Sequence, residues 1–398
     1  MKKRLAIVVD NELDNDVRVL KEINMVKEHE FEIHVLCFGF KGENQQKHSF
    51  PVHRLNIKRK LKNILYFFNL ITPFYEWLWT RHVSRVLSKY DFDAIHVHDL
   101  YMSKAVYRSK QRLNKNIPLI LDLHENYPYA YQLYSWVNKF PNSIFTRPKK
   151  WIKLESHYLG YADRIIVLSN TFKNKLLEKY VFLEASKIFV LPNIIDPSSL
   201  SGDRTLKRTD DRITFLYFGG IALRRGVIDV IQAFEALQDV RKDIRLLLLG
   251  PVDKADREVF FDALDKLNDE VVTYKSWIPA HELDQYMAIA DVGLSPIHVN
   301  PQHESGLANK IFQYMYGGLP LLVSNCQPQR EMIEMHDIGY VFHDQSSLKE
   351  GILFFLTNMK QREEMGKRAY SVVREKYLSR NFEEKLVEFI ESTIELKN

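Results

Sequence analysis

The chain has 398 residues, of which 45% are hydrophobic and 27% are charged, and its formal net charge is +5. This length is too great for one ordinary domain and fits two, each with a buried core. Because only two cysteines occur, Cys37 and Cys326, we expect buried free thiols and neither a disulfide framework nor a zinc site. The start, MKKRLAIVVD, lacks the apolar core of a signal peptide and predicts a first strand.

Short apolar runs alternate with helical patterns through the first half. We expect strands at residues 5–9, 32–38, 94–98, 118–123 and 164–168, and helices at residues 17–28, 101–111 and 145–160. A final run at residues 188–193 ends this half. The alternation predicts an α/β fold with a doubly wound parallel sheet, whose ligands bind beyond the carboxyl ends of the strands.

A basic and aromatic segment interrupts this alternation. Between residues 52 and 90 there are eight lysines and arginines against one acid, Glu76. Residues 63–79, NILYFFNLITPFYEWLW, are too polar for a bilayer span, which needs about 20 apolar residues. The pattern favours a helix on an anionic membrane surface, with a buried helix hairpin as the alternative. No nucleic-acid-binding module accompanies the charge, so we expect no nucleic acid partner.

The second half repeats the alternation after a polar, turn-rich linker at residues 196–211. We expect strands at residues 213–218, 245–249, 271–274, 292–295, 319–324 and 340–342, and helices at residues 226–237, 256–268, 281–290, 308–316 and 347–357. The tail, residues 361–397, predicts further helices. A second parallel sheet therefore follows the first.

Residues 294–325 form the most informative segment. A flexible polar loop, residues 301–306, leads into the helix at 308–316, and such a junction offers free N–H groups to a phosphate. Lys310 lies in the first turn, and Gln313 lies one turn later on the same face. An ordinary β–α–β unit with a polar loop is the alternative.

The stretch NKIFQYMYGGLPLLVS resembles the nucleotide-sugar motif of glycosyltransferase family 4, a retaining family with the GT-B fold. Members carry Lys–x–x–Glu there, and their Glu binds the ribose hydroxyls. Lys310 and Gln313 occupy these positions, and an amide still hydrogen-bonds hydroxyls. An earlier acidic position of the family falls on Ser305, beside Glu304. The resemblance implies that backbone amides near Gly306 and Leu307 contact the diphosphate.

A second cationic loop follows the strand at 213–218 and reads GGIALRRG. Gly219 and Gly220 let the backbone approach a ligand, and Arg224 and Arg225 offer planar donors to a diphosphate. Arg225 matches the family's Lys–Gly site, whereas Gly220 stands where many members have arginine. A solvated surface turn is the alternative. The resemblance also implies that the backbone of Trp277 and Ile278 contacts the nucleotide base.

In the first half, the resemblance places His124 beside the donor sugar. The adjacent Glu125 is expected to bind a sugar hydroxyl or to help deprotonate the acceptor, with helix capping as the alternative. His98, at the end of its strand, is an expected acceptor-side residue. Asp16 and Arg18 match an Asp–x–Arg pattern of related transferases that contacts the acceptor or a phosphate. Capping of the helix by Asp16 is the alternative.

Two Asp–x–Asp triplets, at residues 14–16 and 91–93, raise the question of a metal. The second precedes a strand at its amino end, the wrong edge for a ligand site. We therefore expect no metal and no cofactor, because cationic side chains and a helix dipole can stabilise a leaving diphosphate.

The resemblance implies two Rossmann-like domains facing across a cleft, at residues 1–195 and 196–375, with a last helix at 376–398 returning to the first. It implies sugar transfer from a UDP-, GDP- or dTDP-sugar to a lipid-linked or cell-surface saccharide, at the cytoplasmic face of the membrane. His124, Glu125, Arg225 and Lys310 are the expected catalytic residues. Three alternatives are a non-hydrolysing nucleotide-sugar epimerase, a non-catalytic partner subunit and a membrane-surface scaffold.

Overall fold

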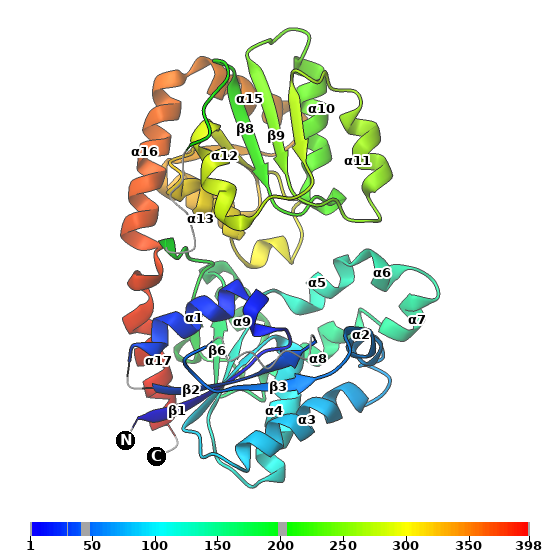
Figure 1. Ribbon diagram of the computed structural model, residues 1–398, viewed down its shortest axis with the longest axis vertical. Coiled ribbons are helices and arrows are strands. Elements are labelled where there is room, and N and C mark those ends of the chain that lie inside the picture. Colours follow the sequence, from blue (N-terminus) through cyan, green and yellow to red (C-terminus); the bar gives the residue numbers. More distant parts are fainter. Residues whose placement is uncertain (1, 30, 41–47, 198–204, 397–398) are drawn as a thin grey trace. The chain divides into compact units, whose positions relative to one another are not determined.

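The computed structural model describes residues 2–29, 31–40, 48–197 and 205–396, and it divides into two compact units (Figure 1). Unit 1 consists of Met1–Pro192 with Ser379–Asn398, and unit 2 consists of Asn193–Leu378. The chain passes between units at residues 192 and 378, against 195 and 375 in the sequence analysis. Part of the expected linker, residues 198–204, lies outside the described residues.

Unit 1 is built on a seven-stranded, wholly parallel sheet with the order β3-β2-β1-β4-β5-β6-β7. Its strands are β1 (Lys3–Val8), β2 (Phe31–Gly39), β3 (Val52–Asn56), β4 (Ala94–His98), β5 (Leu119–Asp122), β6 (Arg164–Val167) and β7 (Ile188–Val190). The order reverses between β1 and β4, which is where a doubly wound sheet opens a ligand site at its carboxyl edge. The α/β class predicted from the sequence is confirmed.

Helices cover both faces of this sheet (Figure 1). They are α1 (Val17–Lys27), α2 (Arg59–Phe67), α3 (Phe74–Leu87), α4 (Ser103–Arg112), α5 (Tyr127–Leu133), α6 (Ser135–Asn138), α7 (Asn142–Thr146), α8 (Lys150–Leu159), α9 (Asn170–Lys179) and α17 (Glu383–Glu395). The last helix belongs to unit 1: Phe389 stacks on Phe189 at 5.1 Å, and Glu391 pairs with Lys3 at 2.9 Å.

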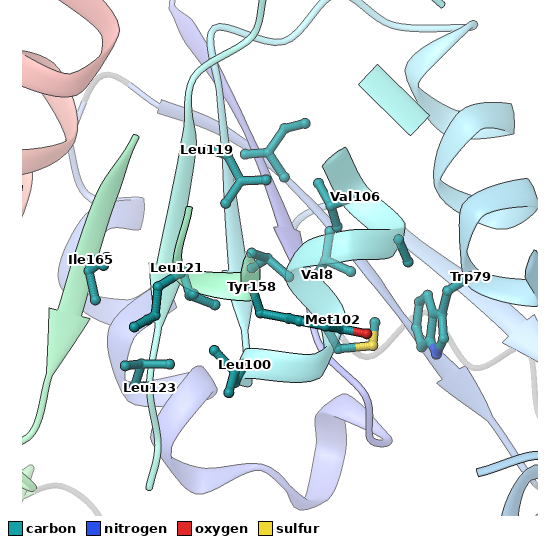
Figure 2. Packing of buried hydrophobic residues seen from close by; sticks show 14 of the residues in the cluster. Val8, Trp79, Leu100, Met102, Val106, Leu119, Leu121, Leu123, Tyr158 and Ile165 are labelled. Carbon is teal, nitrogen blue, oxygen red and sulfur yellow. The ribbon is translucent and has the colours of Figure 1, made fainter. Parts of the chain in front are cut away.

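The core of unit 1 lies between the sheet and helices α3, α4 and α8. Figure 2 shows part of it. Leu121, Leu123 and Ile165 lie at the left of the view, and Val106 and Trp79 lie at the right. Parallel strands buried on both faces consist of nearly continuous apolar residues, and this is the pattern that predicted them. Burial of this apolar surface holds the carboxyl edge of the sheet in place.

Several elements of unit 1 differ from prediction. Strand β3 and helices α5, α6 and α9 were not predicted, and the helix expected at 145–160 is two helices, α7 and α8. The break falls at Arg147, whose φ is 41°, immediately before Pro148. A proline disfavours helical backbone in the residue before it and lacks an N–H, so one continuous helix cannot form there.

The basic aromatic segment forms two helices with different surroundings. Helix α3 buries Tyr75, Trp79 and Val83 in the core, whereas α2 has no buried residue. Lys62 of α2 nevertheless reaches the buried carboxylate of Asp10 at 3.1 Å. The segment is therefore half core and half surface. Among the residues described, no helix has both the length and the apolar character to cross a bilayer.

Unit 2 contains a six-stranded parallel sheet with the order β10-β9-β8-β11-β12-β13. Its strands are β8 (Ile213–Phe218), β9 (Ile244–Leu249), β10 (Val272–Lys275), β11 (Val292–Ser295), β12 (Leu321–Ser324) and β13 (Gly339–Phe342). Its helices are α10 (Val227–Leu237), α11 (Arg257–Leu264), α12 (Leu283–Ile289), α13 (Asn309–Tyr316), α14 (Gln327–His336), α15 (Gln345–Thr357) and α16 (Met359–Lys376). Both cysteines are buried and free, as expected.

The core of unit 2 offers a paired test on α15. Phe355 is fully buried against Phe215, whereas the neighbouring Phe354 is only partly buried beside Tyr340. We expect Phe355→Ala to lower the free energy of unfolding by about 3–5 kcal/mol, because it leaves a cavity in a rigid core. Phe354→Ala should cost clearly less. Urea denaturation followed by circular dichroism measures both, and equal losses would contradict the packing described here.

Candidate functional site

The loop after β8 is shaped by two glycines with positive φ. Gly219 has φ of 126° and Gly226 has φ of 66°, values that side chains with a Cβ rarely adopt. A Cβ on Gly226 would lie 1.8 Å from the carbonyl oxygen of Pro296, so only glycine lets the two segments meet. His298 N donates to Arg224 O at 3.1 Å across this junction. A Cβ at Gly220 would meet nothing within 4 Å, which leaves the backbone there open to a ligand.

Helix α13 presents its amino end beside this loop. It begins at Asn309, one residue later than predicted, and its cap residue Ala308 makes no side-chain hydrogen bond. Gly306 is extended, and the carbonyl of Leu307 accepts from Nδ2 of Asn193 at 2.8 Å. The first-turn amides therefore have no capping side chain, which suits a phosphate.

Lys310 is a buried basic group without an anion among the described residues. Its side chain is almost wholly buried, and Nζ lies 3.6 Å from the centre of the Tyr217 ring. Among the described residues Nζ has no hydrogen-bond partner. Burial, and then the charge of Arg225, hold the pKa of Lys310 well below its usual value. A buried ammonium in this state gains from any anion that reaches it.

Two further cationic groups lie around Tyr217. Arg225 forms no ion pair within the described part of the chain, and Arg224 has one weak partner, Asp253 at 3.9 Å. The pKa of His303 is lowered. Burial lowers it most, the hydrogen bond to the His298 carbonyl raises it, and the charges of Arg225 and Arg224 lower it further. Burial raises the pKa of Tyr217 to about 12, so its hydroxyl stays protonated and donates to Gly220 O at 2.8 Å.

The remaining donor-side predictions are spread over unit 2. Gln313 is half-buried on α13, three residues after Lys310. Glu304 is half-buried in a short turn, and the adjacent Ser305 is buried and donates to Gln302 O at 2.6 Å. Trp277 is exposed, which favours a backbone role over packing, and Ile278 is buried. Sequence reasoning missed Tyr217 and His303, since neither a strand tyrosine nor a loop histidine carries a signal of its own.

In unit 1, His98 and His124 meet at the carboxyl ends of β4 and β5. Nδ1 of His98 lies 2.8 Å from Nε2 of His124, so one imidazole donates to the other. Oδ2 of the buried Asp122 lies 3.5 Å from Nδ1 of His98 and 3.7 Å from Nε2 of His124. The side chain of His124 is 19% exposed and that of His98 is buried. The two histidines expected at the site are thus brought together, and Asp122 was missed.

Asp16 and Arg18 occupy the start of α1, where the alternative reading holds for Asp16. Its carboxylate accepts from Val19 N at 3.1 Å and caps the helix. Arg18 donates through Nη2 to both oxygens of Asp122, at 3.0 and 3.1 Å, and pairs with Glu22 at 3.0 Å. Only 11% of the Arg18 side chain is exposed. Its guanidinium is thus committed to buried carboxylates.

Asp99 and Glu125 complete this edge. Asp99 follows β4 with φ of 70°, a strained value for a residue with a Cβ, and lies 4.0 Å from Nδ1 of His124. Burial and the charge of Asp10 raise the pKa of Asp99 to about 7. Glu125 is half-buried, and its carbonyl accepts from Tyr127 N at 2.9 Å. The sequence analysis did not single out Asp99, whose unusual φ only the structure reveals.

The donor atoms of Glu22, His96, His98 and Asp122 all lie within 4.8 Å of one another. We do not assign them as metal ligands, because the guanidinium of Arg18 already contacts both carboxylates. In the first Asp–x–Asp triplet, Asp14 pairs with His48 and Arg54, at 2.7 and 3.3 Å, and Asp16 caps α1.

A hollow of about 830 Å³ lies at the opposite, amino edge of the unit 1 sheet, lined in part by the second triplet. Its charged groups are largely paired, for example Arg4 with Glu32 at 2.9 Å and Lys3 with Glu391 at 2.9 Å. The carboxyl edges, where buried ionisable groups gather, therefore remain the candidate sites.

Two family models match successive parts of the chain. The model described as "Glycosyltransferase Family 4" matches residues 17–199, and the model described as "Glycosyl transferases group 1" matches residues 203–372. Spore coat protein SA of Bacillus subtilis is 24% identical over 160 residues, which are 38% of this chain and 41% of that protein. The putative teichuronic acid biosynthesis glycosyltransferase TuaH of the same organism is 23% identical over 238 residues, 55% of this chain and 58% of its own.

Solved structures show the same fold. Sucrose-phosphate synthase from Thermosynechococcus elongatus superposes with a TM-score of 0.78 at 14% identity, covering 99% of this chain and 100% of that one. Anabaena HepE in complex with UDP gives a TM-score of 0.71 at 14% identity, covering 98% and 100%. With both halves matched in sequence and the fold matched throughout, the chain belongs to the family 4 type of GT-B glycosyltransferases.

Proposed function

We propose that this chain transfers a sugar from a nucleoside diphosphate sugar to a saccharide hydroxyl, with retention of anomeric configuration. The observation that carries the proposal is Lys310, a buried basic side chain with no anion, close to Arg225, which has no ion pair in the described part of the chain. A buried amine that a bound anion would protonate and a guanidinium without an ion pair, beside free helix amides, suit a diphosphate.

The same groups supply the chemistry. As the bond from the sugar to the diphosphate breaks, negative charge grows on the departing oxygen. Lys310, Arg224, Arg225 and the first amides of α13 stabilise that charge without reorganising. Gln313 hydrogen-bonds the ribose, and the backbone at Trp277 and Ile278 meets the base. HepE structures with UDP and with UDP-glucose support UDP as the nucleotide to test first.

His124 orients the sugar, and Glu125 binds a sugar hydroxyl or accepts the acceptor proton. Because no side chain in the described part of the chain is placed as a covalent nucleophile, we propose front-side attack by the acceptor on the face the diphosphate leaves. A relative named for teichuronic acid biosynthesis supports a lipid-linked or cell-surface saccharide as acceptor.

Release of nucleoside diphosphate tests the proposal directly. We expect one sugar nucleotide from a panel with UDP, GDP and dTDP to be consumed when membrane lipid extract supplies an acceptor. Lys310→Ala and Arg225→Ala should each lower kcat/KM by about 100-fold, since each removes a cation facing the leaving group. Lys360→Ala, which removes an exposed lysine of α16, should change nothing.

Two outcomes would overturn this proposal. Donor binding without turnover, in folded protein and with a complete acceptor extract, would indicate a non-catalytic partner subunit. Conversion of the donor to an isomer without any acceptor would indicate an epimerase. Retention itself is read from the anomeric proton coupling of the product.

Lys310 also makes donor binding dependent on pH. Its pKa is held low in the free protein, and a bound diphosphate raises it. Between these two pKa values binding takes up a proton, so affinity is greatest at the lower pH. Above about pH 7, where the diphosphate is fully ionised, we expect the Kd for UDP to rise by up to about tenfold per pH unit. Calorimetry in buffers of different ionisation enthalpy measures the uptake, which Lys310→Ala should abolish; unchanged uptake in that variant would contradict the role of Lys310.

We further propose that unit 1 rests on an anionic membrane surface through helices α2, α6 and α7. Aromatic rings on these helices, and on Phe68 directly after α2, lie beside one another. The ring centres of Phe67 and Trp136 are 6.1 Å apart, and those of Phe68 and Phe145 are 5.8 Å apart. Phe140, between α6 and α7, is 84% exposed. In the sequence, basic residues adjoin these helices: Lys58, Arg59, Lys60, Lys139 and Arg147. Exposed aromatic rings beside cationic side chains suit the headgroup region of a bilayer.

Vesicle flotation tests this surface. We expect Phe140→Ser with Ile144→Ser to weaken binding to vesicles containing phosphatidylglycerol by about tenfold, because buried apolar area is lost. Val181→Ser is the matched control, since Val181 is 98% exposed on another part of unit 1. Binding that is equal in all three proteins, or absent in the unaltered chain, would reject the membrane surface.

A further inference from the structure

We propose that Asp122 and Arg18 form a positioning pair for His124, in which the carboxylate fixes the His98–His124 hydrogen bond and the guanidinium fixes the carboxylate. The inference rests on the proposed function for its catalytic consequence, namely that His124 lies beside the reacting sugar. Neither Asp122 nor Arg18 contacts the sugar in this proposal, and both act through the imidazole.

Asp122, the last residue of β5, is held in place by Arg18. Nη2 of Arg18 donates to both carboxylate oxygens of Asp122, at 3.0 and 3.1 Å, and these charge-assisted bonds hold the carboxylate in place. Oδ2 then lies within 3.7 Å of both nitrogens that form the His98–His124 hydrogen bond. The direction of one ion pair thus sets the position of two rings.

The charges around Asp122 also favour this pair. Burial works against ionisation of Asp122, but Arg18 and the imidazoles hold its pKa well below the usual value. Burial and then Asp122 raise the pKa of Glu22 well above its usual value. Burial lowers the pKa of His96 and that of His98. These directions favour Arg18 and Asp122 as the charged pair, among groups whose charged forms burial disfavours.

This arrangement leaves one edge of the His124 ring available to a ligand. Because Nε2 of His124 faces His98, its other nitrogen, Nδ1, is on the opposite edge of the ring, with Asp99 at 4.0 Å. The ring is partly exposed, whereas the groups beneath it are buried. The pair thus determines which edge of His124 is presented. The ionisable groups around the two imidazoles are Asp16, Arg18, Glu22, His96, Asp99 and Asp122.

The positioning role and a merely structural ion pair predict different results. Removal of either partner of a structural pair destabilises the fold but leaves kcat of the folded protein unchanged, whereas removal of either partner of a positioning pair also lowers kcat. Removal of opposite charges next to an imidazole pair shifts its protonation in opposite directions. Asp122→Asn should move the midpoint of protonation of the pair to lower pH, and Arg18→Gln should move it to higher pH.

The experiment uses the full chain with isotope-labelled histidine and follows the imidazole signals by NMR from pH 5 to pH 9. Lys179→Gln is the matched control, because Lys179 partners the buried carboxylate of Glu155 at 2.6 Å elsewhere in unit 1. We expect opposite shifts in the two variants and none in the control. Shifts that are absent or in the same direction, in folded proteins, would overturn the proposal.

A second measurement needs no substitution. In the unaltered chain, coupling across the hydrogen bond should join Nδ1 of His98 to Nε2 of His124, and its absence would overturn the proposal even where a variant fails to fold. Kinetics then separate this inference from the proposed function. Both variants should lower kcat by about tenfold or more with little change in the donor KM, and Arg18→Lys should restore part of the loss. Opposite NMR shifts in a chain without transferase activity would support the pair and reject the function, whereas activity with unchanged kcat in both variants would reject the positioning role.

Discussion

Burial of charge is the constraint on which both candidate sites depend. A charged side chain taken out of water requires a compensating partner, and the two units meet this requirement in opposite ways. In unit 1, Arg18 and Asp122 pair with each other. In unit 2, among the described residues, Nζ of Lys310 has the face of Tyr217 and no hydrogen-bond partner. The first arrangement is complete in itself, and the second gains from a ligand anion.

Each solution depends on the parallel sheet beneath it. Strands buried on both faces bring their carboxyl ends to one edge, where β4 and β5 bring His98 and His124 together. In unit 2, the loop after β8 can approach the segment after β11 because Gly226 has no side chain. Apolar packing thus fixes positions, and a few glycines and polar groups then decide what each edge can bind.

The basic aromatic segment shows how one stretch of sequence serves two environments. Helix α3 supplies Trp79 to the core, where its ring nitrogen donates to Asp10 at 3.0 Å. Helix α2 stays outside and is held by Lys62, which reaches the same carboxylate. One buried acid thereby ties an exposed helix to the sheet. The apolar side chains that α2 leaves exposed extend the surface formed by α6 and α7.

Sequence alone determined the α/β class, the alternation in both halves and the helix that begins beside Lys310, because hydrophobic periodicity and turn residues are local signals. It also selected His98 and His124, which follow buried strands. It failed where the decisive contact joins residues distant in sequence. Arg18 matches a ligand-binding pattern, yet the tertiary structure pairs it with Asp122, 104 residues away. Tyr217, Asp122 and Asp99 became visible only with the fold, because burial, pairing and a strained φ are properties of the assembled sheet and not of any segment read by itself.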